Sequence, residues 1–273
     1  MSIGYSRIVC IFFIITVISV SSLGAQPQGR SLKGMSFSGS TGLYSIPTAR
    51  IGWERPNSFG FDLGYHAIIS GGRTAHIPKL SASLFSWIEL NAAVDIQPDG
   101  FVTHDGGADL IAGAKIQFPL TNTALALGGN YQRHNFMNND GYSYNAGQVY
   151  VAITYPGRFF DAPAETTLVL GKTFMENTSN SNIDFGMGFD VILLPKYLGG
   201  LVHWITDFSN FSYSVEPFRA DARYRGLVNS GLRLDFSIIP IFSRLKFVVD
   251  VLISDVFDSN RAFSAGVVLG LPF

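Results

Sequence analysis

Charged residues recur at alternate positions in this chain, as they would along one side of an extended strand. Arg223, Arg225 and Arg233 share one parity within residues 222–237, and side chains two apart in a strand point to the same face. Three guanidinium groups on one face form a basic ladder, which pairs either with anionic solutes or with aspartates on neighbouring strands. The same parity argument gives these candidate inward-facing charges: Asp62, Lys79, Glu89, Asp95, Asp109, Lys115, Asp184, Asp190, Asp207, Arg223, Arg225, Arg233, Asp235, Lys246 and Asp250.

Motifs for enzymatic chemistry are missing from the sequence. It has no G-x-S-x-G, H-E-x-x-H or Walker A motif, and its five histidines lack the spacing of metal ligands. His203 and Asp207 are the nearest approach to a catalytic pair, but four residues of strand separate them by about 13 Å. We therefore expect no catalytic residues, no metal and no cofactor, and we interpret the inward charges as a paired network or a polar pathway.

The N-terminus has the features of an export signal. Arg7 precedes the apolar run "IVCIFFIITVISV", and the small residues Ser22, Gly24 and Ala25 follow it, which predicts a cleaved signal peptide over residues 1–25. An uncleaved membrane anchor is the alternative. Cys10 is the only cysteine, so the mature chain would contain no disulfide to stabilise it.

A period of two runs through the rest of the chain and indicates strands. In "AFSAGVVLGLPF" at the C-terminus, Phe263, Leu269, Leu271 and Phe273 fall on one parity, with small residues between them. Charged residues are only 14% of the chain, yet no apolar run after residue 20 is long enough for a membrane-spanning helix. About twelve segments alternate, at 58–68, 78–86, 88–97, 108–118, 123–132, 146–155, 165–174, 183–193, 201–211, 222–237, 245–254 and 262–273.

These features predict an all-β fold, a transmembrane antiparallel up-and-down β-barrel of about 12 strands over residues 58–273, in the bacterial outer membrane. A soluble β-sandwich is the alternative. Outer connections are expected at 69–77, 98–107, 133–145, 175–182, 212–221 and 255–261. Inner connections are expected to be mostly shorter, as in "PLTNT" and "IPIFSR", with "PGRFFDAP" and "LPKYLGG" a little longer. Aromatic residues at the strand ends would form the two interfacial girdles, in contact with outer-membrane lipid. Phe273 would also act as an assembly signal for the barrel-assembly machinery.

Residues 26–57 have no clear alternation, which predicts either a periplasmic leader or a partial plug in the barrel mouth. Within them, "TGLYSIPTAR" resembles the start of the YjbH-type family of outer-membrane proteins associated with exopolysaccharide production, matched at Gly42, Leu43 and 47–50. "SWIEL" is similar to the Trp-Leu-Glu stretch of that family, and "DFSNFSYS" at 207–214 is a weaker match. The chain is shorter than typical members. The resemblance implies a barrel working near surface polysaccharide or its export apparatus, and it assigns no catalytic residues.

The expected function is therefore a non-enzymatic channel or accessory for passage of solutes or surface polysaccharide. One alternative is a plugged structural or adhesive barrel that acts through its outer loops, and another is a barrel-embedded hydrolase or acyltransferase. The net charge of −1 argues against a nucleic-acid partner.

Overall fold

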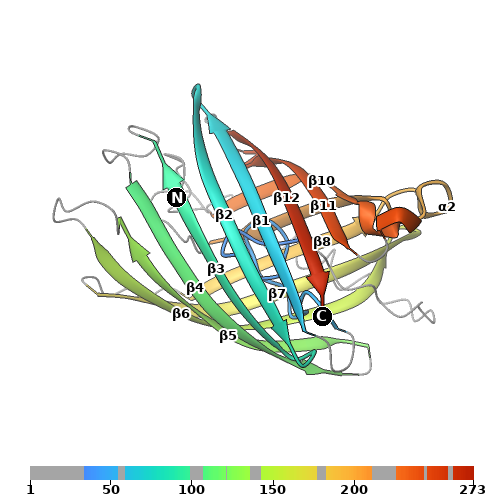
Figure 1. The fold of residues 1–273 in the computed structure, drawn as a ribbon, viewed down its shortest axis with the longest axis horizontal. Helices are drawn as coiled ribbons and strands as arrows, with labels where there is room; N and C mark the ends of the chain where they lie inside the picture. Colours follow the sequence, from blue (N-terminus) through green and yellow to red (C-terminus); the bar gives the residue numbers. More distant parts are fainter. Residues whose placement is uncertain are drawn as a thin grey trace, which may run out of the picture.

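The computed structural model describes residues 34–54, 59–98, 107–120, 122–135, 143–176, 183–210, 226–242, 245–257 and 261–273. Twelve antiparallel strands follow one another around a closed barrel, and the first pairs with the last (Figure 1). The predicted fold class is confirmed. The strands are β1 (Gly60–Ser70), β2 (Arg73–Leu84), β3 (Ile88–Gln97), β4 (Gly107–Pro119), β5 (Ala124–His134), β6 (Tyr144–Phe159), β7 (Ala162–Met175), β8 (Asp184–Ile192), β9 (Val202–Ser209), β10 (Leu227–Asp235), β11 (Lys246–Ser254) and β12 (Ala262–Pro272).

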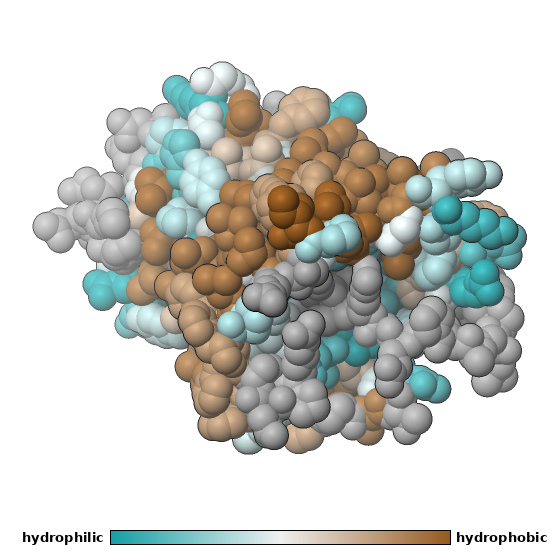
Figure 2. Space-filling model, turned by 45° about the vertical axis from the view of Figure 1, so that its right-hand side comes forward, coloured by the Kyte–Doolittle hydropathy of each residue, from teal (hydrophilic) through white to brown (hydrophobic). Residues whose placement is uncertain are grey.

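The two parities of each strand face different surroundings. In β12, Phe263 is 62% exposed on the outside, whereas Ser264 and Val268 are buried toward the lumen. The same alternation in the other strands gives the outside a broad hydrophobic area (Figure 2). An apolar exterior around a closed sheet is the solution that a lipid bilayer imposes, because every backbone polar group must be paired there. The chain is an outer-membrane β-barrel protein, as its sequence predicts.

The seam between β1 and β12 closes the sheet in register. Ten Cα pairs run from Gly60↔Pro272 to Ile69↔Phe263. Beyond Gly60, Phe59 and Phe273 exchange both backbone hydrogen bonds, at 2.7 and 3.3 Å. The C-terminal residue thus takes part in the seam through its backbone. We call the end of the barrel where β1 begins and β12 ends the inner end, and the opposite end the outer end.

Two connections differ from the sequence predictions. The expected outer loop at 69–77 is a tight turn, since β1 and β2 pair as far as Ser70↔Arg73 across Gly71 and Gly72. Both glycines have positive φ (57° and 77°), a backbone conformation that costs glycine little. Likewise, "PGRFFDAP" does not form a loop, because β6 and β7 continue through it to the Phe159↔Ala162 pair. Proline and glycine are typical of turns, but Pro156 and Gly157 lie within the paired strands of this hairpin, opposite Glu165 and Ala164.

Within the described ranges, helical structure is limited to short connections at the inner end. These are α2 (Pro195–Leu198), η3 (Phe236–Ile238) and η4 (Pro240–Phe242). Among the described residues, no helix is both long and apolar enough to cross a membrane. The predicted signal peptide, residues 1–25, lies outside the described residues.

Candidate functional site in the barrel lumen

Residues 34–54 fold back into the lumen, inside the ring of strands that follows them (Figure 1). We call this segment the plug. It contains no helix or regular strand, only two isolated bridges, Met35↔Thr41 and Gly42↔Pro47. Its own backbone bonds, such as Leu43 N–H to the Ile46 carbonyl at 3.0 Å, fold it into compact turns. Of the two possibilities that the sequence left open for this region, a plug describes residues 34–54.

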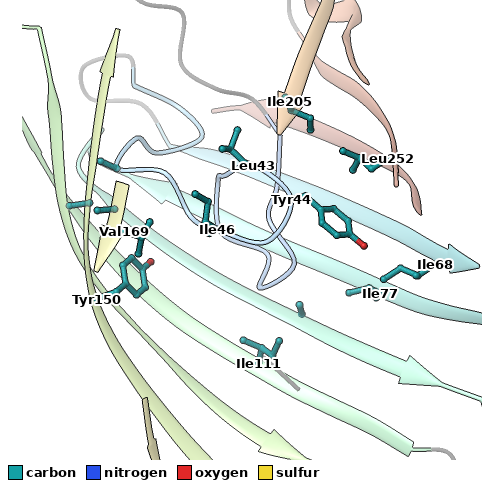
Figure 3. Packing of buried hydrophobic residues seen from close by; sticks show 14 of the residues in the cluster. Leu43, Tyr44, Ile46, Ile68, Ile77, Ile111, Tyr150, Val169, Ile205 and Leu252 are labelled. Atoms are coloured by element: carbon teal, nitrogen blue, oxygen red, sulfur yellow. The ribbon is translucent and has the colours of Figure 1, made fainter. Parts of the chain in front are cut away.

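Apolar side chains of the plug pack against an apolar part of the lumen wall. Leu43, Tyr44 and Ile46 belong to one buried cluster with inward-facing residues of the strands (Figure 3). These wall residues include Ile68, Ile77, Ile111, Ile205 and Leu252. Burial raises the pKa of the Tyr44 phenol, so this ring occupies the lumen as a neutral group. The contact excludes water from around the polar groups described next.

The carboxylate of Glu89 on β3 is the first polar anchor of the plug. It accepts hydrogen bonds from Thr41 N (2.8 Å), Ser40 Oγ (2.7 Å), Thr41 Oγ1 and Gly52 N (3.0 Å). It also pairs with Lys115, directly opposite on β4, at 3.1 Å. Both side chains are fully buried, and a buried charge is tolerated only when it is paired and hydrogen-bonded in this way.

Asp207 on β9 is the second anchor, across the lumen from the first. Its Oδ2 accepts the backbone N–H groups of Tyr44 (2.8 Å) and Ser45 (2.7 Å), while Oδ1 accepts Ser45 Oγ and Asn229 Nδ2. Ser209, two residues further on, places its Oγ 3.1 Å from Ser45 Oγ. A carboxylate that accepts two consecutive N–H groups fixes the local turn of the chain.

The wall cations bind the carbonyl groups of the plug. Lys115 Nζ donates to the carbonyls of Thr41 (3.2 Å), Thr48 (3.0 Å) and Arg50 (2.7 Å). Three further wall residues each donate to one plug carbonyl: Lys79 to Ser36 (2.8 Å), Arg233 to Gly42 (3.1 Å) and Lys246 to Gly52 (3.0 Å). The wall side chains therefore bind the plug mainly through the backbone groups of the plug.

The C-terminal part of the plug runs along the inner end of β4, β6 and β7. Ala49 N–H bonds Thr154 Oγ1 and Ile51 N–H bonds Gln117 Oε1, both at 2.9 Å. Arg50 Nε donates to Glu165 Oε1 at 2.9 Å. Arg50 is thus a cation of the plug that pairs with a carboxylate of the wall.

Most of the charges expected to face inward are buried on the lumen side. Two ion pairs join directly opposite residues, Glu89–Lys115 and Arg233–Asp250, the latter through bidentate bonds of 2.8 and 2.9 Å. Lys246 and Asp62 pair at 2.6 Å across β12, where Gly270 leaves room for both. Other buried members of the set are Lys79, Asp95, Asp184, Asp190, Asp207 and Asp235.

Three expectations for the site need separate comment. Arg223 and Arg225, two members of the proposed basic ladder, lie outside the described residues. His203 does not act with Asp207, because its Nδ1 bonds Asp190 on β8 instead. Sequence analysis also missed Glu165 and Thr154, which the strand parity of β6 and β7 would have placed inside. Among the described residues, no group of three or more metal-ligating side chains is placed to hold a metal ion.

Three sequence stretches that are far apart meet at the plug. "TGLYSIPTAR" forms the middle of the plug, Glu89 of "SWIEL" binds Thr41, and Asp207 of "DFSNFSYS" binds Tyr44 and Ser45. The contacts span 48 and 162–163 residues of sequence. The three stretches, although distant in sequence, therefore belong to one interface between the plug and the wall.

Comparisons with known proteins identify no family for the chain. No protein-family model and no curated protein matches the chain. Among solved structures it is similar to the KdgM porin in complex with disordered oligogalacturonate, with 9% identity and a TM-score of 0.49 over 78% of this chain and 99% of that one. It is also similar to the outer membrane protein Omp33 of Acinetobacter baumannii, with 9% identity and a TM-score of 0.40 over 80% and 100%.

Proposed function

We propose that this protein is a non-enzymatic channel of the outer membrane that is closed by its own N-terminal plug and conducts when the plug leaves the lumen. The observation that carries the proposal is the chemistry of the plug interface. The wall holds the plug through carboxylates, ammonium groups and amides that bind its backbone. Groups of this kind regain water when the plug departs, so unseating costs far less than exposing an equally large apolar core.

The cargo is proposed on a different basis. The resemblance to YjbH-type proteins implies passage or assistance of surface polysaccharide, with the export apparatus as partner, and an open lumen lined by polar side chains is compatible with a hydroxyl-rich solute. A permanently plugged structural barrel is the competing function, and it makes the opposite prediction for conductance.

A reversible lock between plug and wall tests the proposal. Ser45 Oγ and Ser209 Oγ are 3.1 Å apart, close enough for Ser45→Cys and Ser209→Cys to form a disulfide. Cys10, the only natural cysteine, falls in the predicted signal peptide. The refolded double variant is studied in planar bilayers, with heat-dependent gel mobility as the check that the barrel has formed.

We expect no conductance from the oxidised double variant and conductance after reduction, while each single variant conducts under both conditions. Equal conductance in the locked and reduced states would show that the plug is not the gate. Silence of the folded protein in both states would favour the structural barrel.

A further inference from the structure

Over the described strands, the buried part of the lumen wall carries more negative than positive charge. Four cations are buried on the lumen side, Lys79, Lys115, Arg233 and Lys246, while Arg73 and Arg158 share the lumen parity at exposed strand ends. Nine carboxylates are buried on that side, Asp62, Glu89, Asp95, Glu165, Asp184, Asp190, Asp207, Asp235 and Asp250, and Asp109 is 17% exposed there. The plug does not neutralise this excess, since Arg50 and Glu54 are its only charged residues between positions 34 and 54.

Two pairs of carboxylates face one another directly, one toward each end of the barrel. Asp95 on β3 is opposite Asp109 on β4 near the outer end, and Glu165 on β7 is opposite Asp190 on β8 near the inner end. Like charges directly opposite on adjacent strands destabilise a sheet. Such pairs are tolerated where a positive group is shared between them.

Buried oxygens of these pairs have no hydrogen-bond partner. They are Asp95 Oδ1, Glu165 Oε2 and Asp190 Oδ2, on residues that are 2%, 9% and 3% exposed. A desolvated carboxylate oxygen without a donor is costly. Each of these oxygens is therefore a place where a cation or a hydrogen-bond donor is favoured.

Between the two ends of the barrel, the side-chain oxygens of Asn91 and Asn130 also lie close together without a hydrogen-bond donor. Asp184 can only accept, so Gln148 Nε2 donates to it and Gln148 Oε1 accepts from Asn130 Nδ2. That chain of bonds leaves Asn130 Oδ1 over Gly113 without a partner. From the other side, Asn91 Nδ2 donates to the Ser38 carbonyl and leaves Asn91 Oδ1 free over the same glycine.

The plug itself shows what the inner carboxylate pair accepts. Arg50 bonds Glu165 Oε1 at 2.9 Å, so a guanidinium group occupies this site while the lumen is closed. When the plug leaves, Arg50 leaves with it and Glu165 loses its cation, while Asp190 keeps His203 and Arg233 of the wall as partners. A cation from solution then has the interactions that Arg50 had.

We propose that the open lumen is a cation-selective path along the β3–β8 wall, with an acidic pair toward each end and Arg50 bound to Glu165 of the inner pair in the closed state. The ligand class is a cation, inorganic or organic amine, and acidic polymers are disfavoured as cargo. The inference rests on the proposed function, because it concerns the lumen after the plug has moved.

Selectivity is measured in the full chain carrying the reducible lock, after reduction, as the K⁺ to Cl⁻ permeability ratio in a salt gradient. We expect K⁺ to be favoured by on the order of tenfold at low salt, since a low-dielectric cleft of one sign concentrates its counter-ions. Adding Asp95→Asn and Asp190→Asn, whose hydrogen bonds and ion pairs go to the wall residues Gln97, His203 and Arg233, should bring the ratio toward one. Glu176→Gln, which removes one charge from an exposed residue of the outer end, should leave it unchanged.

A second readout does not depend on conductance. Ser264 is buried on the lumen side of β12, and Ser264→Cys in the otherwise natural chain would react with thiol reagents only when the plug is out. A cationic methanethiosulfonate should react faster than an anionic one of similar size, and the two neutralising substitutions should remove the difference. Conductance or labelling without a preference for cations would overturn the cation path and leave the proposed gated channel standing. No conductance and no labelling would reject the gated channel, and the cation path with it.

Discussion

Replacing Glu89 with glutamine should loosen the plug without changing the volume of the site. Glu89 accepts four hydrogen bonds from the plug, two from backbone N–H groups and two from hydroxyls. Glutamine keeps one acceptor oxygen but presents an NH₂ group to the remaining donors, and it removes the charge. Net contributions of about 1.5–3 kcal/mol per hydrogen bond to a charged group are not additive, so we take about 3 kcal/mol as the loss for the seated plug, or roughly a hundredfold in the ratio of seated to unseated states.

The assay is the labelling of a cysteine in the plug. Ser36 is fully buried in the lumen, so Ser36→Cys reacts only from the unseated state. Where seating is fast compared with the reaction, the rate is proportional to the unseated fraction. We expect Glu89→Gln to raise the labelling rate of Ser36→Cys by about a hundredfold.

Asp184→Asn is the matched control. Asp184 is a buried lumen carboxylate too, but it accepts hydrogen bonds from Gln148 and Thr173 on the wall. If Asp184→Asn accelerated labelling as much as Glu89→Gln, the effect would come from a general loosening of the barrel, and the anchor role of Glu89 would be refuted.

Three further outcomes follow from other contacts. Thr154→Val, which removes the partner of Ala49 N–H, should raise the labelling rate of Ser36→Cys by only about fivefold, the equivalent of about 1 kcal/mol; an effect as large as that of Glu89→Gln would contradict this ranking. Val151→Arg on the lipid side near the middle of β6 should lower the free energy of unfolding into denaturant from lipid by about 2–4 kcal/mol, whereas Leu271→Arg near the inner rim should cost about 0–1 kcal/mol; equal costs would argue against the assigned membrane position. Phe273→Ala should reduce the amount of folded barrel in cell envelopes while leaving refolding in detergent intact, since its seam bonds to Phe59 are made by the backbone; normal levels in cells would contradict an assembly role of the ring.

The strands could be predicted from sequence because their signal is local. Alternation in "AFSAGVVLGLPF" reports directly which side faces lipid, and the exposed Phe263 and Leu269 agree with it. Turns were harder to predict. The glycines at 71 and 72 lie in a stretch that reads as a loop until the pairing of β1 with β2 is known.

The plug contacts could not be predicted, for a physical reason. Each joins an irregular segment to a wall residue tens to almost two hundred positions away, as Lys246 does with Gly52. No periodicity marks residues 34–54, and their partners look like any other inward charge. Parity showed that Glu89 and Asp207 point into the lumen, but it contained no information about which group they bind.

The backbone contacts of the plug have a consequence for how the protein changes over evolutionary time. Glu89, Asp207 and Lys115 hold N–H and carbonyl groups that every residue type except proline carries. Plug residues whose side chains only fill space can therefore be substituted over time, while selection retains Glu89, Asp207 and Lys115 on the wall. Related chains should diverge most freely at plug positions whose side chains make no bond to the wall, and least at the distant strand positions that bind the plug backbone.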